Sequence, residues 1–395
     1  MKIVRLANYV APASGGLRTA LAELGAGYLA AGHEPVLVVP GARPGRRQSR
    51  QGLVITVPGV PVPGTGGYRA ITARRSLRRL LEELQPDQLE VSDRTTLRWT
   101  GAWARRCGIR SMMVSHDSLA ALAQMFRPPG LSVRQLVDRL NRNTAASFDV
   151  VVCTTAWAAA EFRRLAVPNL VQVPLGVDLA GFHPSRFDES LRSQLAPGEH
   201  RLLVHCSRLS PEKRPERAIG ALAELRQRGV RAVLVVAGDG PLRRPLQGRA
   251  AGLPVRFLGH VADRGSLARL LATADVVIAP GPAETFGLSA LEALASGTPV
   301  VVSSQSALPE VVGEAGLAAG DNDAACADAV QRLLRRDPAE RRRLARQQAE
   351  RFGWPAAVNG FLDAHGLAPL PRGGEGTPAV SPHQVAYITG RTFFA

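Results

Sequence analysis

The chain has 395 residues, of which 45% are hydrophobic and 21% are charged. These values are ordinary for globular proteins, so they exclude a collagen-like repeat, a coiled coil and a disordered chain, and the length favours two domains. The 49 basic residues outnumber the 33 acidic ones, and a net charge of +16 favours anionic partners such as phosphates, acidic lipids or nucleic acid. Only Lys2 and Lys213 are lysines, and the arginine-rich codon usage of a GC-rich genome also explains the charge.

The sequence shows no targeting segment and no cross-linking pattern. Its longest apolar runs, such as 36–39 and 232–237, are strand-sized and fall short of the ~18 residues that cross a bilayer. The N-terminus reaches Asn8 and Pro12 before any apolar stretch as long as a signal-peptide core. The four cysteines form no C-x-x-C pair, so neither a zinc site nor a disulfide framework is predicted. We expect a cytoplasmic protein.

The first half of the chain alternates strand-like apolar runs with helical patterns, which is typical of parallel α/β units. A turn at Gly15 and Gly16 separates the first strand from the first helix, and residues 41–52 predict an exposed basic loop. The segment 71–84 predicts an amphipathic helix with arginines along one face. We expect the remaining elements to be strands at 2–6, 33–39, 88–91, 111–114 and 149–153, and a helix at about 17–31.

Gly and Pro residues interrupt the pattern at 173–184, where we predict a hinge between domains. The pattern then restarts, so two Rossmann-like, doubly wound parallel sheets are expected, in residues 1–176 and 177–365. The last helix, at 354–364, is a candidate for crossing back to the first domain, and the Pro/Gly-rich residues 366–395 predict a flexible tail. The second half should contain strands at 201–206, 232–237, 255–258, 276–279 and 298–302, and helices at 216–226, 266–272, 289–295 and about 324–352.

Residues 280–300, PGPAETFGLSALEALASGTPV, have the features of an anion site. Ligands of open α/β sheets bind beyond the carboxyl ends of the strands, where loops meet helix N-termini. The amides of Phe286, Gly287 and Leu288 fall where a helix begins, and unpaired amides there bind phosphate. Glu284 and Glu292 are spaced to hold sugar hydroxyls, although glutamate pairs of this spacing are more often simply solvated.

Two cations lie near this helix start in the predicted sheet. In RLSPEKRPE at 208–216, Arg208 follows the end of a strand and Lys213 precedes the next helix. An arginine fork and a mobile lysine charge so placed suit a diphosphate. Two solvated loop cations are the alternative interpretation.

The order of these motifs resembles a known enzyme family. PEKRPE, VVAGDGPLR with Gly238, FLGHV at 257–261 and ADVVIAPGPAETFGLSALEALASGTPVV resemble the C-terminal half of a retaining nucleotide-sugar glycosyltransferase of family 4. That family has the GT-B fold, in which two Rossmann-like domains face a central cleft. The N-terminal half resembles the family more weakly, through Gly15 and Gly16, His116 in VSHDS and Asp178 in PLGVD, and NYVAPASGG lacks the longer aromatic-proline opening common in relatives.

The resemblance implies an acceptor-binding N-terminal domain and a donor-binding C-terminal domain. Glu284 would hold the transferred sugar and Glu292 the ribose hydroxyls, while Arg208 and Lys213 would bind the pyrophosphate. The other donor contacts would come from the amides of Gly16, Gly287 and Leu288 at the pyrophosphate, from the backbone of His260 and Val261 against the base, and from His116 at the sugar or its phosphate.

The resemblance also implies retaining transfer without a protein nucleophile. The acceptor hydroxyl would attack on the face that the nucleotide leaves, and the departing β-phosphate oxygen would take its proton. Catalysis would then depend on stabilising the diphosphate, without a metal or other cofactor. GDP-mannose is the first expected donor because AETFGLSALEALASGTPVV most resembles mannosyltransferases, and UDP-sugars, especially UDP-N-acetylglucosamine, come next.

The sequence gives weaker signals for the acceptor site than for the donor site. Glu90, Asp93 and Arg94 are expected at the mouth of the cleft, where they would hydrogen-bond a polar acceptor, although an N-capping Asp beside a solvated Arg explains them as well. The basic helix at 71–84 and the loop at 41–52 offer a face that can rest on anionic lipid, each cation contributing about 1 kcal/mol. That face favours a lipid-linked acceptor at the inner membrane surface, and a small natural product is the alternative.

Three other classes of protein fit less well. NYVAPASGG lacks the G-x-G-x-x-G of a dinucleotide-dependent oxidoreductase. Aromatic residues amount to only 5% and no recognised motif appears, which argues against nucleic-acid binding. A sugar phosphorylase of the same fold would share the phosphate site, but the paired glutamates favour a nucleotide sugar.

Overall fold

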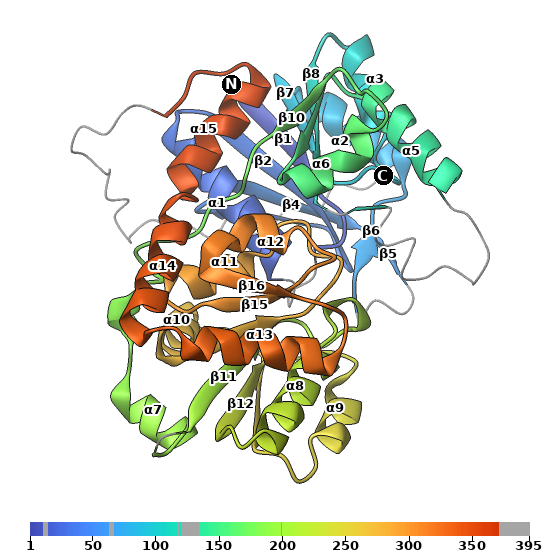
Figure 1. Cartoon of the computed structure of the whole chain (residues 1–395). Helices are drawn as coiled ribbons and strands as arrows, with labels where there is room; N and C mark the ends of the chain where they lie inside the picture. The colour runs from blue at the N-terminus through green and yellow to red at the C-terminus, as the bar shows by residue number, and fades with distance from the viewer. Residues whose placement is uncertain (11–14, 63–66, 117, 120–133, 199, 371–395) are drawn as a thin grey trace.

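Two sheets form the centre of this computed structural model, each built from the apolar runs of one half of the chain (Figure 1). Helices cover both faces of each sheet, so the strands are nearly continuous apolar runs rather than alternating patterns. The structure describes residues 1–10, 15–62, 67–116, 118–119, 134–198 and 200–370.

The N-terminal sheet has the strand order β10-β9-β8-β7-β1-β2-β4-β3, and its strands are parallel except for the last pair. Val4 of β1 pairs with Val36 on one side and with Leu89 on the other. A small antiparallel pair, β5 (Val60–Pro61) and β6 (Arg69–Ala70), lies outside this sheet. The strands of the sheet are β1 (Lys2–Leu6), β2 (Glu34–Gly41), β3 (Gly45–Ser49), β4 (Gly52–Pro58), β7 (Gln88–Val91), β8 (Arg110–Ser115), β9 (Val150–Cys153) and β10 (Leu170–Gln172).

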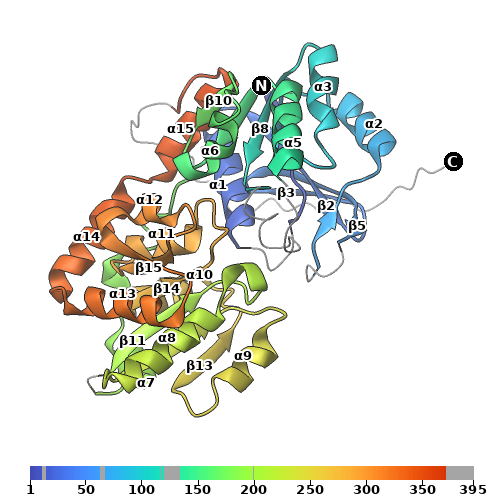
Figure 2. The same ribbon diagram turned by 45° about the vertical axis from the view of Figure 1, so that its right-hand side comes forward.

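Helices from both ends of the chain cover this sheet (Figure 2). Two of them, α1 and α15, pack on the face that carries Ile3 and Val114. The other helices pack on the opposite face, which carries Val4 and Leu89. The helices of this domain are α1 (Gly16–Ala30), α2 (Arg74–Leu84), α3 (Trp99–Arg106), α5 (Arg134–Ser147), α6 (Ala156–Arg163) and α15 (Trp354–His365).

The segment 41–52 is not the loop that the sequence predicted. Its central residues form β3, which pairs antiparallel with β4 at the edge of the sheet. The side chains of β3 are largely exposed, as predicted, and Arg46 forms an ion pair with Glu83 of α2 at 2.6 Å. An exposed, charged edge strand lacks hydrophobic alternation, so its sequence resembles a loop, and its charges discourage pairing with another chain.

The C-terminal sheet is entirely parallel in the order β13-β12-β11-β14-β15-β16. The strand order reverses between β11 and β14, which is the position at which open α/β sheets bind ligands. The strands are β11 (Arg201–Cys206), β12 (Ala232–Ala237), β13 (Val255–Gly259), β14 (Val276–Ala279), β15 (Val300–Ser303) and β16 (Gly316–Ala319).

The helices of the C-terminal domain include a break that the sequence analysis did not predict. The helical stretch expected at 324–352 is two helices, because Pro338 cannot continue the first one and Asp337 caps the second. The elements are η1 (Pro184–Arg186), α7 (Glu189–Leu195), η2 (Pro211–Lys213), α8 (Glu216–Gln227), α9 (Arg243–Arg249), α10 (Arg264–Thr273), α11 (Leu288–Ala295), α12 (Leu308–Val312), η3 (Gly313–Ala315), α13 (Asp323–Arg335) and α14 (Pro338–Glu350).

Within the described residues, the chain passes between the domains twice, and the two crossing segments are hydrogen-bonded to each other. The Val177 N–H donates to the Phe352 backbone oxygen at 2.8 Å, beside a bridge between Val177 and Gly353. Beyond this point α15 lies against α1 (Figures 1 and 2), so closely that a Cβ on Gly27 would stand 2.3 Å from a Val358 methyl carbon.

The predicted tail begins too early. Leu367 and Leu370 pack against the core, and the Leu370 N–H donates to Asn359 Oδ1 at 2.7 Å. The rest of the predicted tail, residues 371–395, lies outside the described residues.

Candidate active site

Helix α11 begins at the end of the loop that follows β14. Gly287 is its N-cap, with φ +75°, and a Cβ there would stand 2.1 Å from Leu308 Cδ2, so both the backbone angle and the packing require glycine. Gly287 has no side chain that could cap the helix, and the first amides of a helix are suited to binding an anion. Phe286 is buried and packs edge-to-face on Phe352, fixing the loop just before these amides.

Lys213 and Glu284 meet at this helix start. Lys213 ends the 3-10 turn η2 after β11, and its Nζ lies 2.5 Å from Glu284 Oε1. Burial alone would lower the pKa of Lys213, but the Glu284 carboxylate holds that pKa above its ordinary value. A Cβ on Gly281 would stand 3.2 Å from the Lys213 Cα, so the two segments pack backbone against backbone. The structure therefore brings together one cation and one carboxylate predicted at the donor.

Arg208 is covered by an aromatic ring from the other domain. Its guanidinium lies 4.7 Å from the centroid of Tyr68, and Tyr68 packs edge-to-face on Tyr9. Tyr68 also contributes, after Glu284 and Glu212, to raising the pKa of Lys213. The packing around Gly238 requires a glycine, because a Cβ at this position would stand 1.8 Å from the Ser207 backbone oxygen.

Glu292 lies further along α11, beside Arg264 at the start of α10. Burial raises the pKa of Glu292 to about 7, and Arg264, whose Nη2 donates to Glu292 Oε1 at 3.2 Å, opposes the shift. The Arg264 guanidinium in turn lies 4.8 Å from the centroid of the Phe182 ring. His260 and Val261 follow β13 and precede α10, so the predicted base loop leads directly to Arg264.

The N-terminal domain contributes Gly16 and His116. A Cβ on Gly16 would lie 3.9 Å from Leu288 Cδ1, so the first residue of α1 lies beside the start of α11, whereas Gly15 has open space around its Cα. The His116 ring hydrogen-bonds Ser92 Oγ at 3.1 Å, and burial lowers its pKa to about 4. His116 is therefore a neutral imidazole at physiological pH.

The predicted acceptor role of Glu90 is wrong. Glu90 is only 1% exposed, and its carboxylate accepts from Arg5 Nε at 2.8 Å and from the Tyr28 hydroxyl at 2.7 Å. His365 of α15 lies 3.4 Å away. Burial alone would raise the pKa of Glu90, but Arg5 and these hydrogen bonds lower it to about 2. This carboxylate joins α1 and α15 to the sheet inside the N-terminal domain.

The predicted acceptor roles of Asp93 and Arg94 are wrong as well. Asp93 accepts from the Thr95 and Leu97 amides at 3.0 and 3.1 Å, so it caps its own turn. The alternative interpretation, an Asp at a helix N-cap, is wrong too, because the N-cap of α3 is Arg98. Arg94 is not solvated, because it is 6% exposed and forms an ion pair with Glu161 at 2.9 Å. Both side chains are turned into the domain, since polar groups at the end of a buried strand need partners there.

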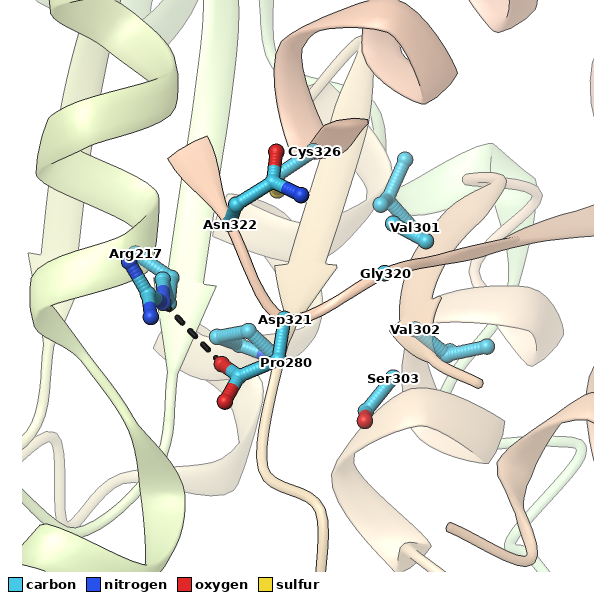
Figure 3. A pocket seen from close by; sticks show the side chains of 10 residues that line it. Arg217, Pro280, Val301, Val302, Ser303, Gly320, Asp321, Asn322 and Cys326 are labelled. Atoms are coloured by element: carbon cyan, nitrogen blue, oxygen red, sulfur yellow. Dashed lines mark hydrogen bonds and ion pairs between the residues drawn. The ribbon is translucent and has the colours of Figure 1, made fainter. Parts of the chain in front are cut away.

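A small hollow elsewhere in the C-terminal domain is not the donor site. Figure 3 shows it beside Pro280, Asp321 and Cys326, where Arg217 Nε donates to Asp321 Oδ1 at 3.1 Å. Its volume is about 10 Å³, room for a single water molecule. A nucleotide or a sugar does not fit there.

Comparisons with known proteins assign the chain to a family. Residues 15–176 match the family model of the glycosyl transferase 4-like domain, and residues 200–336 match that of the glycosyl transferases group 1. Over 364 residues the chain is 50% identical to the GDP-mannose-dependent α-(1-6)-phosphatidylinositol dimannoside mannosyltransferase of Mycobacterium tuberculosis, covering 92% of this chain and 95% of the relative. The chain belongs to the group 1 glycosyltransferases.

Solved structures confirm the fold of this group 1 glycosyltransferase. Sucrose-phosphate synthase from Thermosynechococcus elongatus matches with a TM-score of 0.73 at 22% identity, over 90% of this chain and 96% of that chain. HepE of Anabaena in complex with UDP matches with a TM-score of 0.71 at 18% identity, over 92% and 99% of the two chains. The GT-B fold expected from the motifs is therefore confirmed.

Three residues of this glycosyltransferase's site were missed by the sequence analysis: Tyr68, Arg264 and Thr285. Thr285 lies inside the motif that was recognised, but its contacts with the other domain had no local signal. Within the described residues, no helix has both the length and the hydropathy to cross a bilayer. In the same part of the chain, no group of three or more His, Cys, Asp or Glu side chains could hold a metal ion.

Proposed function

We propose that this glycosyltransferase moves a mannosyl group from GDP-mannose to a hydroxyl of a phosphatidylinositol mannoside, with retention of the anomeric configuration. The 50% identical relative is a GDP-mannose-dependent mannosyltransferase of phosphatidylinositol dimannoside, which supports this donor and acceptor class. We place the donor at the start of α11 because Lys213 and Glu284 lie 2.5 Å apart there and the N-cap residue has no capping side chain. Cation, carboxylate and free amides together suit a diphosphate that is linked to a sugar.

The diphosphate of the donor would lie between Lys213, Arg208 and the first amides of α11. Gly16 is beside the same helix start, and its small size leaves room for the phosphates between the domains. Fixed positive charge at this position stabilises the charge that develops on the leaving diphosphate, and it needs no reorganisation during the reaction.

The two glutamates would each bind one of the two sugars of the donor. Glu284, next to Lys213, would accept from hydroxyls of the transferred mannose. Glu292 would accept from the ribose hydroxyls, held in place by Arg264, with the base against His260 and Val261. Its pKa of about 7 means that Glu292 reaches full ionisation only above neutral pH in the free enzyme.

The reaction proposed for this site is the one that the family resemblance implies. The acceptor oxygen would bond to the anomeric carbon on the face that GDP leaves, while the bond from that carbon to the β-phosphate oxygen breaks. The proton of the acceptor hydroxyl would pass to the same phosphate oxygen. No protein nucleophile and no metal ion takes part in this proposal.

The basic face of the N-terminal domain would lie against the acidic inner surface of the membrane and give access to the lipid acceptor. Arg75 and Arg79 of α2 are exposed, and Arg46 of β3 is held on the same face by its ion pair with Glu83. Each cation near an anionic surface contributes about 1 kcal/mol. We expect flotation with vesicles that contain phosphatidylinositol but not with phosphatidylcholine vesicles, and weaker flotation for the Arg75→Glu/Arg79→Glu variant.

One assay tests the whole proposal. The full chain is incubated with GDP-mannose, UDP-N-acetylglucosamine or UDP-glucose, each with phosphatidylinositol dimannoside or with free inositol. We expect product only from GDP-mannose with the lipid, an α linkage by NMR, and the same rate after EDTA treatment. Transfer from a UDP-sugar alone would replace the donor, and a β product would refute retention.

A further inference from the structure

The loop that carries Glu284 is hydrogen-bonded directly to the N-terminal domain. Its next residue, Thr285, donates from Oγ1 to the backbone oxygen of His116 at 2.5 Å. The backbone oxygen of Thr285 accepts from Thr155 Oγ1 at 2.9 Å and from Thr154 Oγ1 at 3.3 Å. One residue of the donor loop thus makes three hydrogen bonds to residues that follow β8 and β9 of the other domain.

The three threonines that make these hydrogen bonds are buried. Thr285 is 8% exposed, and Thr154 and Thr155 are 2% and 1% exposed. Buried hydroxyl and carbonyl groups are costly to leave unpaired, so the contacts favour one arrangement of the two domains over others near it. Any relative movement that separates the loop from β8 and β9 breaks all three together.

Thr285 connects Glu284, which the proposed function places at the transferred sugar, with His116, which the family resemblance places at the sugar or its phosphate. Its backbone continues into Glu284, whose carboxylate contacts Lys213. Its hydroxyl contacts the backbone of His116, whose ring bonds to Ser92. The position of a carboxylate from one domain relative to an imidazole from the other therefore depends on this hydroxyl.

A second contact crosses the same interface without involving Thr285. Glu310 of α12 accepts from the amides of Ala156 and Trp157 at 2.9 and 3.2 Å, where α6 begins, and from Gln172 Nε2 at 3.2 Å. A carboxylate at a helix start is stabilised by the helix dipole. This contact joins the two domains at α6 and does not involve the donor loop. Substituting Glu310 is therefore a control that loosens the domain interface without changing the contacts of Thr285.

We propose that Thr285 is a positioning residue of the transfer reaction, whose hydroxyl and carbonyl hold Glu284 in register with the acceptor domain. This inference rests on the function proposed above. Correct register matters because transfer and hydrolysis compete: the mannosyl group passes either to the acceptor oxygen or to water, and GDP leaves in both reactions. Misplacing the sugar by about 1 Å slows attack by the acceptor up to ~10²-fold, and a loosened interface admits water.

The test compares Thr285→Val, which keeps the volume and removes the hydroxyl, with Thr285→Ser, which keeps the hydroxyl. For Thr285→Val we expect the transfer kcat to fall at least about tenfold and the ratio of free mannose to mannosylated lipid to rise severalfold. The Kd for GDP, measured by calorimetry, should stay within about twofold, because Lys213 and the α11 amides are unchanged. Thr285→Ser should stay within about threefold of the wild type in each quantity, and Glu310→Ala should leave the product ratio unchanged.

Three results would overturn the proposal: wild-type kcat and product ratio in Thr285→Val, equal losses in Thr285→Val and Thr285→Ser, or a ratio raised as far by Glu310→Ala. Thermal unfolding checks that each variant folds. If Thr285→Val does not fold, Thr285→Ala removes the same hydroxyl with a smaller side chain, and a wild-type kcat and product ratio in that variant would overturn the proposal in the same way. If the wild type transfers only from a UDP-sugar, the GDP-mannose proposal fails, and the same ratios measured with that sugar decide the role of Thr285.

Discussion

Lys213 Nζ lies 2.5 Å from Glu284 Oε1, so the cation proposed for the diphosphate and the carboxylate proposed for the sugar form an ion pair with each other. In the proposed complex, a donor bound between them would exchange this pair for two new contacts, from the phosphates to Lys213 and from the mannose hydroxyls to Glu284. Substituting either residue therefore changes the surroundings of the other, and the two substitutions differ in which part of the donor they affect.

Lys213→Ala should weaken GDP binding. The loss of one charge-assisted contact costs about 1.5–3 kcal/mol, which is about 10- to 150-fold in Kd. Arg214→Ala is the matched control, because Arg214 is the next cation along the chain and its ion pairs with Glu216 and Asp321, at 3.7 and 3.6 Å, are partly exposed. Calorimetry with GDP measures both, and equal Kd values for the Lys213 variant and the wild type would exclude Lys213 from the diphosphate site.

Glu284→Gln should abolish most of the transfer while leaving GDP binding intact. The variant loses the charged acceptor for the mannose hydroxyls, a contact of about 1.5–3 kcal/mol, so kcat/KM for GDP-mannose should fall about 10- to 150-fold. GDP has no mannose, so its Kd should not rise. Steady-state kinetics and calorimetry on the same preparation separate the two quantities, and unchanged turnover would refute the role of Glu284.

Glu292 should make the stability of the free enzyme depend on pH. Its pKa is raised from 4.5 to about 7, chiefly by burial, so the folded chain keeps a proton that the unfolded chain loses between these values. The contribution of Glu292 to the free energy of unfolding therefore falls as pH rises from about 4.5 to 7, by at most about 3 kcal/mol. Glu292→Gln removes this loss. Urea titrations from pH 4.5 to 8 should show the variant gaining stability over the wild type as pH rises, and a constant difference would contradict the assignment.

Glu90→Ala should destabilise the fold rather than change the choice of acceptor. The substitution leaves Arg5 buried without its carboxylate, a change that costs about 3–5 kcal/mol. Glu34→Ala is the control, because Glu34 is 67% exposed and 3.9 Å from Lys2, so its loss should cost less than about 1 kcal/mol. Urea unfolding measures both. A stable Glu90 variant with altered acceptor preference would restore the role that the structure contradicts.

The chain end after α15 should contribute to stability. Leu367 and Leu370 are half-buried against the core, and the Leu370 amide donates to Asn359. A chain ending at Leu370 should be more stable than one ending at His365 by about 1–3 kcal/mol, the value of burying these side chains in part. Equal melting temperatures for the two truncations would show that these contacts contribute nothing.

The strands could be predicted because parallel strands buried on both faces are continuous apolar runs bounded by turns. The runs at Lys2–Leu6 and Ala232–Ala237 correspond exactly to β1 and β12. The edge strand Gly45–Ser49 lacks that signal, because its residues are exposed and charged. Segments with weak periodicity, such as Trp99–Arg106, form helices through tertiary packing, which a local pattern does not contain.

In the candidate site, too, the residues with a local sequence signal could be predicted and those without one could not. Lys213 and Glu284 could be predicted because each lies in a recognisable motif at a strand end. Tyr68 could not, because its contact with Arg208 joins segments far apart in the sequence. Glu90 was assigned wrongly because its partners Arg5, Tyr28 and His365 come from segments far from it in the sequence, so the position appeared open to a ligand.

The paired crossings at Val177 and Gly353 have a consequence for how the protein is made. Helix α15 belongs to the N-terminal domain in space and to the end of the chain in sequence. During synthesis the first 176 residues emerge without the helix that covers α1, so the apolar surface around Tyr28 stays open until the C-terminal domain has left the ribosome. The domain that begins first is thus completed last.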